Sequence, residues 1–171
     1  MPTGAKLRFH PLKAAFHIVL IEPEIPPNTG AIARTCAATH TPLHLIGPLG
    51  FRIDAQAVRR AGLDYWNDVQ LSRHNSFDDF LQQHPHRALH LFTSNAPRSY
   101  LDANFQPGDV LVFGKESVGL DPELCARFSD RCIAIPTSGS VRSLNLSNAV
   151  AIALYEALRQ CGAFEKTAFE E

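Results

Sequence analysis

The chain has 171 residues and a formal net charge of −1, with 45% hydrophobic and 19% charged residues. This length suits one compact domain whose core needs no metal or disulfide to stabilise it. The composition excludes an intrinsically disordered chain, and the near-zero charge excludes a strongly basic nucleic-acid-binding protein, although a local basic patch is compatible with it.

Short apolar runs alternate along the chain with amphipathic stretches, and no internal repeat interrupts them. Apolar runs predict strands at residues 16–21, 43–46, 69–71, 87–92, 110–113 and 132–135. Helical spacing and capping residues predict helices at residues 28–39, 54–62, 76–83 and 145–160, and a further one from Pro122. Asn28 is expected as the N-cap of the first helix. This alternation predicts an α/β fold: a mostly parallel sheet flanked by helices.

Polar loops follow three of these strands, where ligands bind in parallel sheets. On the first helix, Arg34 points away from the predicted core face, so it is either a solvated arginine or directed at an anion. After residue 113, glycines flank Glu116, which indicates either a close approach to a ligand or an ordinary turn. After residue 135, the hydroxyls and amides around Ser143 and Asn145 indicate either a polar site or a capping loop.

Two further patterns point to partners. The last predicted helix has a second, partly apolar face at Ile152 and Tyr155, which favours a subunit contact. Arg59 and Arg60 precede Tyr65 and Trp66, a combination that either holds phosphates and stacks bases or returns its aromatic rings to the core.

Cysteine and histidine spacings predict neither disulfides nor a metal site. The four cysteines form no C-x-x-C pair and match no zinc pattern, so we expect reduced thiols in a cytoplasmic protein. His84, His86 and His90 are close together, but no cysteine or carboxylate completes a ligand set. Residues 16–21 are too few to span a membrane.

Three segments together resemble the motifs of the SPOUT superfamily of S-adenosylmethionine-dependent RNA methyltransferases. They read PEIPPNTGAIAR at residues 23–34, LVFGKESVGL at 111–120 and IPTSGSVRSLNLSNAV at 135–150. With RRAGLDY at residues 59–65, the chain is similar to the small single-domain members that 2′-O-methylate the wobble nucleotide of certain tRNAs, cytidine or modified uridine.

The resemblance implies a C-terminal trefoil knot and a homodimer with its active site at the subunit interface, where Arg34 faces the cofactor of the other subunit. S-adenosylmethionine would lie in the knot, held mainly by the main chain at Phe92, Thr93, Gly114, Glu116, Ile135, Ser143 and Leu144. Arg34, Asn28, Ser143 and Asn145 would form the catalytic site. Because arginine is a reluctant base, we expect Arg34 to orient the 2′-hydroxyl or stabilise its developing charge.

The resemblance also implies domain boundaries, and it leaves alternatives for the function. We expect one domain at residues 16–162, an extension at 1–15 that is disordered or contacts tRNA, and an acidic tail at 163–171. Without an appended RNA-binding domain, tRNA would be held by the dimer surface, with Arg59, Arg60, Tyr65 and Arg142 as candidates. The alternatives are a SPOUT enzyme for another tRNA or rRNA position and a non-catalytic RNA-binding dimer.

Overall fold

The computed structural model describes residues 6–51 and 66–170. A six-stranded sheet runs through its centre in the order β4-β3-β2-β6-β5-β7, and every neighbouring pair is parallel. The strands are β2 (His17–Ile21), β3 (Leu43–Ile46), β4 (Leu71–His74), β5 (Leu89–Phe92), β6 (Val110–Phe113) and β7 (Cys132–Ile133). The predicted fold class is therefore confirmed.

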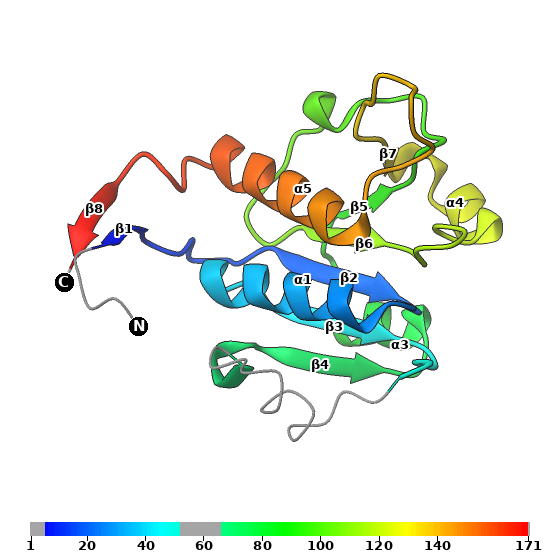
Figure 1. Ribbon diagram of the computed structural model, residues 1–171, viewed down its shortest axis with the longest axis horizontal. Coiled ribbons are helices and arrows are strands. Elements are labelled where there is room, and N and C mark those ends of the chain that lie inside the picture. Colours follow the sequence, from blue (N-terminus) through cyan, green and yellow to red (C-terminus); the bar gives the residue numbers. More distant parts are fainter. Residues whose placement is uncertain (1–5, 52–65, 171) are drawn as a thin grey trace.

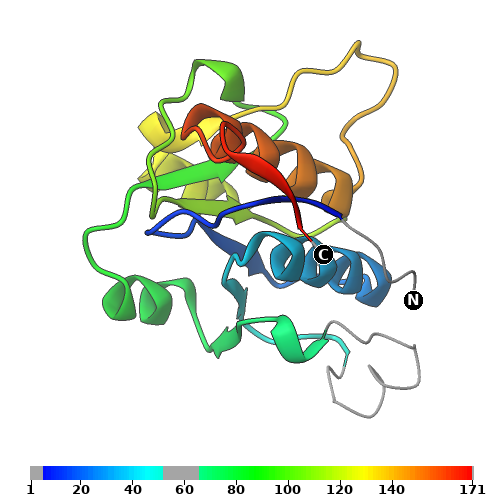
Figure 2. The same ribbon diagram turned by 90° about the vertical axis from the view of Figure 1, so that its left-hand side faces the viewer.

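Helices cover both faces of this sheet (Figures 1 and 2). On one face, α1 (Pro26–Thr39) and α5 (Leu146–Gln160) pack on alternate strand residues such as Ile18, Leu20 and Leu43. On the other face, α3 (Phe77–Gln83) and α4 (Pro122–Arg127) pack on the intervening residues, including Val19 and Ile46. Side chains alternate along a strand, so continuous apolar runs are needed where helices cover both faces.

The ends of three predicted elements differ from expectation. Strand β4 lies later than the predicted residues 69–71, and β5 begins at Leu89 rather than at residue 87. Arg87 is instead held by its side chain, whose Nη1 donates to the Gly108 carbonyl at 2.7 Å. Strand β7 ends at Ile133, after which Ala134 pairs with the loop residue Ser99.

Helix α1 begins at Pro26, so the prediction of Asn28 as its N-cap is wrong. Proline is favoured in the first turn because it has no N–H to leave unpaired and its φ is already helical. The cap position falls on Ile25, and Asn28 is buried inside the first turn. Asp121, directly before α4, and Asn145, directly before α5, do cap their helices, since their side chains accept backbone N–H groups.

Two segments outside the predicted domain pair with each other. Strand β1 (Lys6–Phe9) and strand β8 (Thr167–Glu170) form an antiparallel two-stranded sheet, which extends away from the main sheet in Figure 1. The ring of Phe164 joins this pair to the domain. Its centroid lies 5.1 Å from that of the Phe9 ring and 5.5 Å from that of the Tyr155 ring of α5. The sequence did not predict this pairing, because the two strands lie at opposite ends of the chain.

Short 3-10 helices complete the description: η1 (Trp66–Asp68), η2 (Tyr100–Asp102) and η3 (Ser129–Arg131). The helix predicted at residues 54–62 lies outside the described residues. Among the helices that the structure describes, none is long and apolar enough to cross a membrane.

Candidate functional site

The loops that follow β2, β6 and β7 lie along one edge of the sheet, because parallel strands end on the same side. We call this region the loop edge and define it as residues 22–28, 114–120 and 134–148. Strands β2 and β6 are direct neighbours, and β5 separates β6 from β7. The three segments that carry the predicted site are therefore brought together, as expected for a ligand site in a parallel sheet.

The loop after β6 is a narrow hairpin that glycine makes possible. The backbones of Lys115 and Gly119 exchange two hydrogen bonds of 3.1 and 2.9 Å. A Cβ on Gly114 would lie 2.2 Å from the carbonyl carbon of Gly119, so no other residue fits there. Gly119 has a φ of +77°, which favours glycine. This hairpin fixes the position of Glu116 at its tip.

The carboxylate of Glu116 holds the start of helix α1. Its Oε2 accepts the backbone N–H of Glu24 at 2.7 Å, and its Oε1 accepts the N–H of Ile25 at 3.2 Å. The same Oε1 accepts Nδ2 of Asn28 at 3.1 Å. A carboxylate from a distant loop therefore binds the N–H groups of the two residues that precede α1. The sequence did not predict this role of the Glu116 side chain.

Asn28 extends the contact to the start of helix α5. Its Oδ1 accepts Nδ2 of Asn145 at 3.0 Å. The Oδ1 of Asn145 caps α5, since it accepts the backbone N–H of Ser147 at 2.9 Å and that of Asn148 at 3.4 Å. Glu116, Asn28 and Asn145 thus form one hydrogen-bonded network, and each comes from a different motif of the sequence.

Two further interactions beside this network were not predicted: one is a pair of hydrogen bonds and the other is an ion pair. The Glu24 carboxylate accepts the backbone N–H and the Oγ hydroxyl of Ser117, both at 2.9 Å, and these hydrogen bonds lower the pKa of Glu24. Lys115 pairs with Glu22 at 2.7 Å, and this contact raises the pKa of Lys115. The only signal in the sequence was the charged residues directly after two strands.

Strand ends that are predicted to hold the cofactor lie at the same edge. Phe92 and Phe113 end β5 and β6, and their rings stack at 4.7 Å. The N–H of Thr93 donates to the Ile133 carbonyl at 3.0 Å, and its own carbonyl accepts from Ala96 at 3.3 Å. The main chain of Thr93 thus takes part in hydrogen bonds at the ends of β5 and β7.

The loop from β7 to α5 is long and largely exposed (Figure 1). Ile135 and Leu144 are half-buried in it, whereas Arg142 and Ser143 are exposed. Ser143 lies two residues before the cap Asn145 and so stands beside the network described above. The structure thus places Ser143 and Leu144 at the loop edge.

Arg34 lies on a different face of α1 from Asn28. Six residues separate them, which corresponds to about 240° around a helix. Arg34 is exposed, as predicted, and the position above Gly30 is open, since a Cβ there would meet nothing within 4 Å. The structure therefore groups Asn28 with Asn145 and Glu116 and directs Arg34 outward. The candidate RNA-binding residues Arg59, Arg60 and Tyr65 lie outside the described residues.

A parallel α/β sheet with polar residues at its C-terminal edge is typical of ligand-binding domains, and comparison with known proteins identifies the family. The model of the SpoU rRNA methylase family matches residues 15–155. The chain belongs to this family, and its fold is that of the SPOUT methyltransferases.

Individual relatives cover nearly the whole domain. The chain is 47% identical over 150 residues to a tRNA (cytidine(34)-2′-O)-methyltransferase of Burkholderia pseudomallei, covering 86% of this chain and 96% of the relative. A solved structure concerning the 2-OH methylation of C/U34 on tRNA is 49% identical, with a TM-score of 0.80 and coverage of 86% and 96%. An AdoMet-bound rRNA methyltransferase of Sinorhizobium meliloti is 27% identical, with a TM-score of 0.75 and coverage of 88% and 58%.

Proposed function

We propose that this protein is an S-adenosylmethionine-dependent tRNA 2′-O-methyltransferase that acts on the ribose of the wobble nucleotide, cytidine or uridine at position 34. The observation that carries the proposal is the network of Glu116, Asn28 and Asn145, which joins the three motifs at the loop edge. The activity of the Burkholderia relative supports the choice of nucleotide.

The loop edge fits an adenosine-containing sulfonium cofactor. Ile135 and Leu144 offer half-buried apolar side chains, and Gly114 is a buried position without a side chain. The cofactor would be held mainly by main-chain groups, at Phe92, Thr93, Gly114, Glu116, Ile135, Ser143 and Leu144. The cofactor supplies an electrophilic methyl group. An AdoMet-bound neighbour with the same fold supports this assignment.

The protein's part in the reaction is to position and activate a weak nucleophile. The methyl group that the cofactor would supply would replace the proton of the ribose 2′-hydroxyl, and that proton would leave to solvent. Asn28, Ser143 and Asn145 orient the ribose, and the Arg34 guanidinium stabilises the developing negative charge on the oxygen. Holding the reactants in line supplies several kcal/mol, up to roughly 7–11 in well-oriented systems.

We further propose that the active enzyme is a homodimer in the cytoplasm, with Arg34 of one subunit at the loop edge of the other. The outward direction of Arg34 supports this arrangement. So does the second face of α5, where Ile152 is 39% exposed and Tyr155 is 45% exposed. The C-terminal segment of residues 134–160 would be threaded into the trefoil knot. Residues 16–162 would form the single domain, with tRNA held by Arg59, Arg60, Tyr65 and Arg142.

Methyl transfer to tRNA that lacks wobble ribose methylation tests the proposal. The protein is incubated with methyl-labelled S-adenosylmethionine and this tRNA, and the labelled nucleotide is identified after digestion. A tRNA carrying 2′-deoxycytidine at position 34 is the matched control, because it has no 2′-hydroxyl to methylate. We expect label in 2′-O-methyl nucleotide 34 of the first tRNA and none in the control.

Two other results would overturn the assignment. Label at another nucleotide, retained in the deoxycytidine control, would identify a SPOUT methyltransferase for a different position. Salt-dependent tRNA binding by a folded dimer that takes up no S-adenosylmethionine would identify the non-catalytic RNA-binding protein.

A further inference from the structure

Four histidines meet on the face of the sheet that α3 covers. His17, His44 and His74 come from the neighbouring strands β2, β3 and β4, and His84 directly follows α3. We call these four residues the histidine cluster. The ring centroids of His17, His74 and His84 lie 5.0, 5.2 and 5.0 Å from that of His44. The cluster is separate from the loop edge and has no part in the proposed methyl transfer.

Hydrogen bonding within the cluster is incomplete. Nδ1 of His17 lies 2.8 Å from Nε2 of His44, and Nδ1 of His44 lies 3.0 Å from Nε2 of His74. A neutral imidazole has one donor and one acceptor, so these three rings form a chain. Nδ1 of His74 ends the chain, is buried and has no hydrogen-bond partner among the described residues. A buried polar atom of this kind requires a partner.

A histidine binds a metal ion through a ring nitrogen of its neutral form, so each ring of the cluster can offer one lone pair to an ion.

We propose that His44, His74 and His84 bind one divalent transition-metal ion, with zinc the expected ion. One imidazole nitrogen from each of these residues lies within 4.8 Å of the others. Three imidazoles and a water are a familiar zinc ligand set, whereas magnesium and calcium require oxygen ligands. His44 can bind the ion through Nδ1 while its Nε2–H donates to His17, the type of contact that orients a ligating histidine.

Metal binding requires a modest rearrangement of the cluster. Zinc–nitrogen bonds of about 2.0–2.1 Å place tetrahedral ligand atoms about 3.4 Å apart. Nδ1 of His44 and Nε2 of His74 lie 3.0 Å apart as a hydrogen-bonded pair, so the ion would replace this hydrogen bond and the two nitrogens would move slightly apart. His84 is half-buried at the end of α3 and is the residue that can move.

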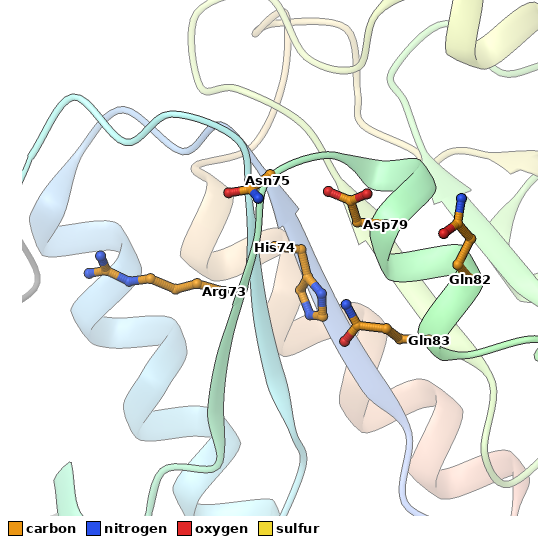
Figure 3. Close-up of a pocket in the computed structure, with 6 residues that line it drawn as sticks. All are labelled: Arg73, His74, Asn75, Asp79, Gln82 and Gln83. Atoms are coloured by element: carbon orange, nitrogen blue, oxygen red, sulfur yellow. The ribbon is translucent and has the colours of Figure 1, made fainter.

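A surface depression beside α3 reaches the cluster at His74. The other residues that line this depression are Arg73, Asn75, Asp79, Gln82 and Gln83. Figure 3 shows the His74 imidazole inside it, with the Gln83 side chain extending toward the ring. The Asp79 carboxylate lines the same depression and contributes favourable charge for a cation. The site would tie strands β3 and β4 to the end of α3, so its effect is on stability.

Metal content and thermal unfolding of the untagged full-length protein test this proposal. Chelator-treated protein is titrated with Zn²⁺, and bound metal is counted after gel filtration. We expect one Zn²⁺ per chain and a Tm increase of about 5–10 °C at a free concentration one hundred times Kd. Co²⁺ substitution should give a tetrahedral spectrum without thiolate bands, consistent with burial raising the pKa of Cys36 to about 12 and that of Cys125 to about 11.

A pair of variants in the same turn makes the result specific. H84Q removes one ligand, and we expect it to weaken Zn²⁺ binding at least 100-fold while the metal-free protein stays folded. H86N is the matched control, because His86 is exposed two residues away and asparagine tolerates its positive φ of 70°. Unbound Zn²⁺ in the wild type, thiolate bands with Co²⁺, or equal binding by H84Q and wild type would each overturn the proposal.

Discussion

The loop edge and the histidine cluster are both built from polar residues, but their physical chemistry differs. At the loop edge, the Glu116 carboxylate meets backbone and amide donors at an exposed or half-buried surface. In the histidine cluster, the ring nitrogens of His17, His44 and His74 bond to one another inside the protein. The first region is charged and open to solvent, whereas the rings of the second are neutral and mostly buried, with His84 half-buried at its edge.

Because of this difference, we expect the two regions to have different roles. An exposed network with a charged centre can bind and orient a polar ligand, while a buried neutral network affects mainly the stability of the elements that it joins. Substitutions at the loop edge should therefore change methyl transfer, and substitutions in the histidine cluster should change unfolding. The predictions below test that separation.

The largest effect is expected for Arg34 at the proposed subunit interface. R34A should lower single-turnover methyl transfer to tRNA at least 100-fold, because it removes the charge that stabilises the reacting oxygen. Affinity for S-adenosylmethionine, measured by calorimetry, should stay within a few-fold. R127A is the control, since Arg127 is an exposed arginine of α4 that pairs with Asp78 of α3. A loss of cofactor affinity in R34A would show that Arg34 has another role.

The next largest effect is the pH dependence of unfolding that the histidine cluster causes. In the unfolded chain, His17 and His44 take up protons below about pH 6.5, whereas in the metal-free folded protein their pKa values are about 4 and about 3. The unfolded state thus binds more protons, and stability is lost as pH falls from 6.5 toward 4. Each proton contributes about 1.4 kcal/mol per pH unit.

Denaturant unfolding between pH 7.5 and 4 in a chelator measures this dependence. H44F should reduce the slope of the unfolding free energy against pH by about one proton, because one titrating ring is removed. H86N should leave the slope unchanged. If H44F had the wild-type slope, acid sensitivity would arise elsewhere in the protein.

Substitution of Glu116 should affect both the stability of the fold and methyl transfer, and the expected effect is smaller than the two described above. E116Q removes the charge and turns an amide donor toward groups that are themselves donors. We expect the free energy of unfolding to fall by about 1–3 kcal/mol and methyl transfer to decrease with it. The exposed Glu123 of α4 provides the control E123Q. Full methyl-transfer activity in E116Q would show that the hydrogen bonds of Glu116 at the start of α1 are not needed for the reaction.

The smallest effect is the coupling between Asn28 and Asn145. Each alanine substitution should cost about 1 kcal/mol, and the double variant should cost less than the sum by about 0.5 kcal/mol or more, because the two side chains share one hydrogen bond. The pair of Asn28 with the exposed Asn104, at the opposite edge of the sheet, should be additive. An additive Asn28–Asn145 pair would mean that the network is not formed in solution.

Most of the fold could be predicted from local patterns, and the errors lie where tertiary contacts decide. The apolar runs of β2, β3 and β6 were located almost to the residue because both faces of the sheet are covered. The start of α1 was misplaced, because a capping asparagine is a local signal and the Glu116 carboxylate comes from a loop 88 residues away in the chain. The boundaries of β4, β5 and β7 also differ from the prediction, because contacts with residues elsewhere in the chain set them, such as that of Arg87 with Gly108.

The sequence by itself determined the α/β class, the three polar loops and the residues that later meet at the loop edge, because strand ends, glycines and capping residues are short-range signals. Only the tertiary structure decided that Glu116 caps α1, that β1 pairs with β8 and that four histidines adjoin. His17, His44 and His74 lie 27 and 30 residues apart in the chain, and strand pairing with side-chain alternation alone places them side by side.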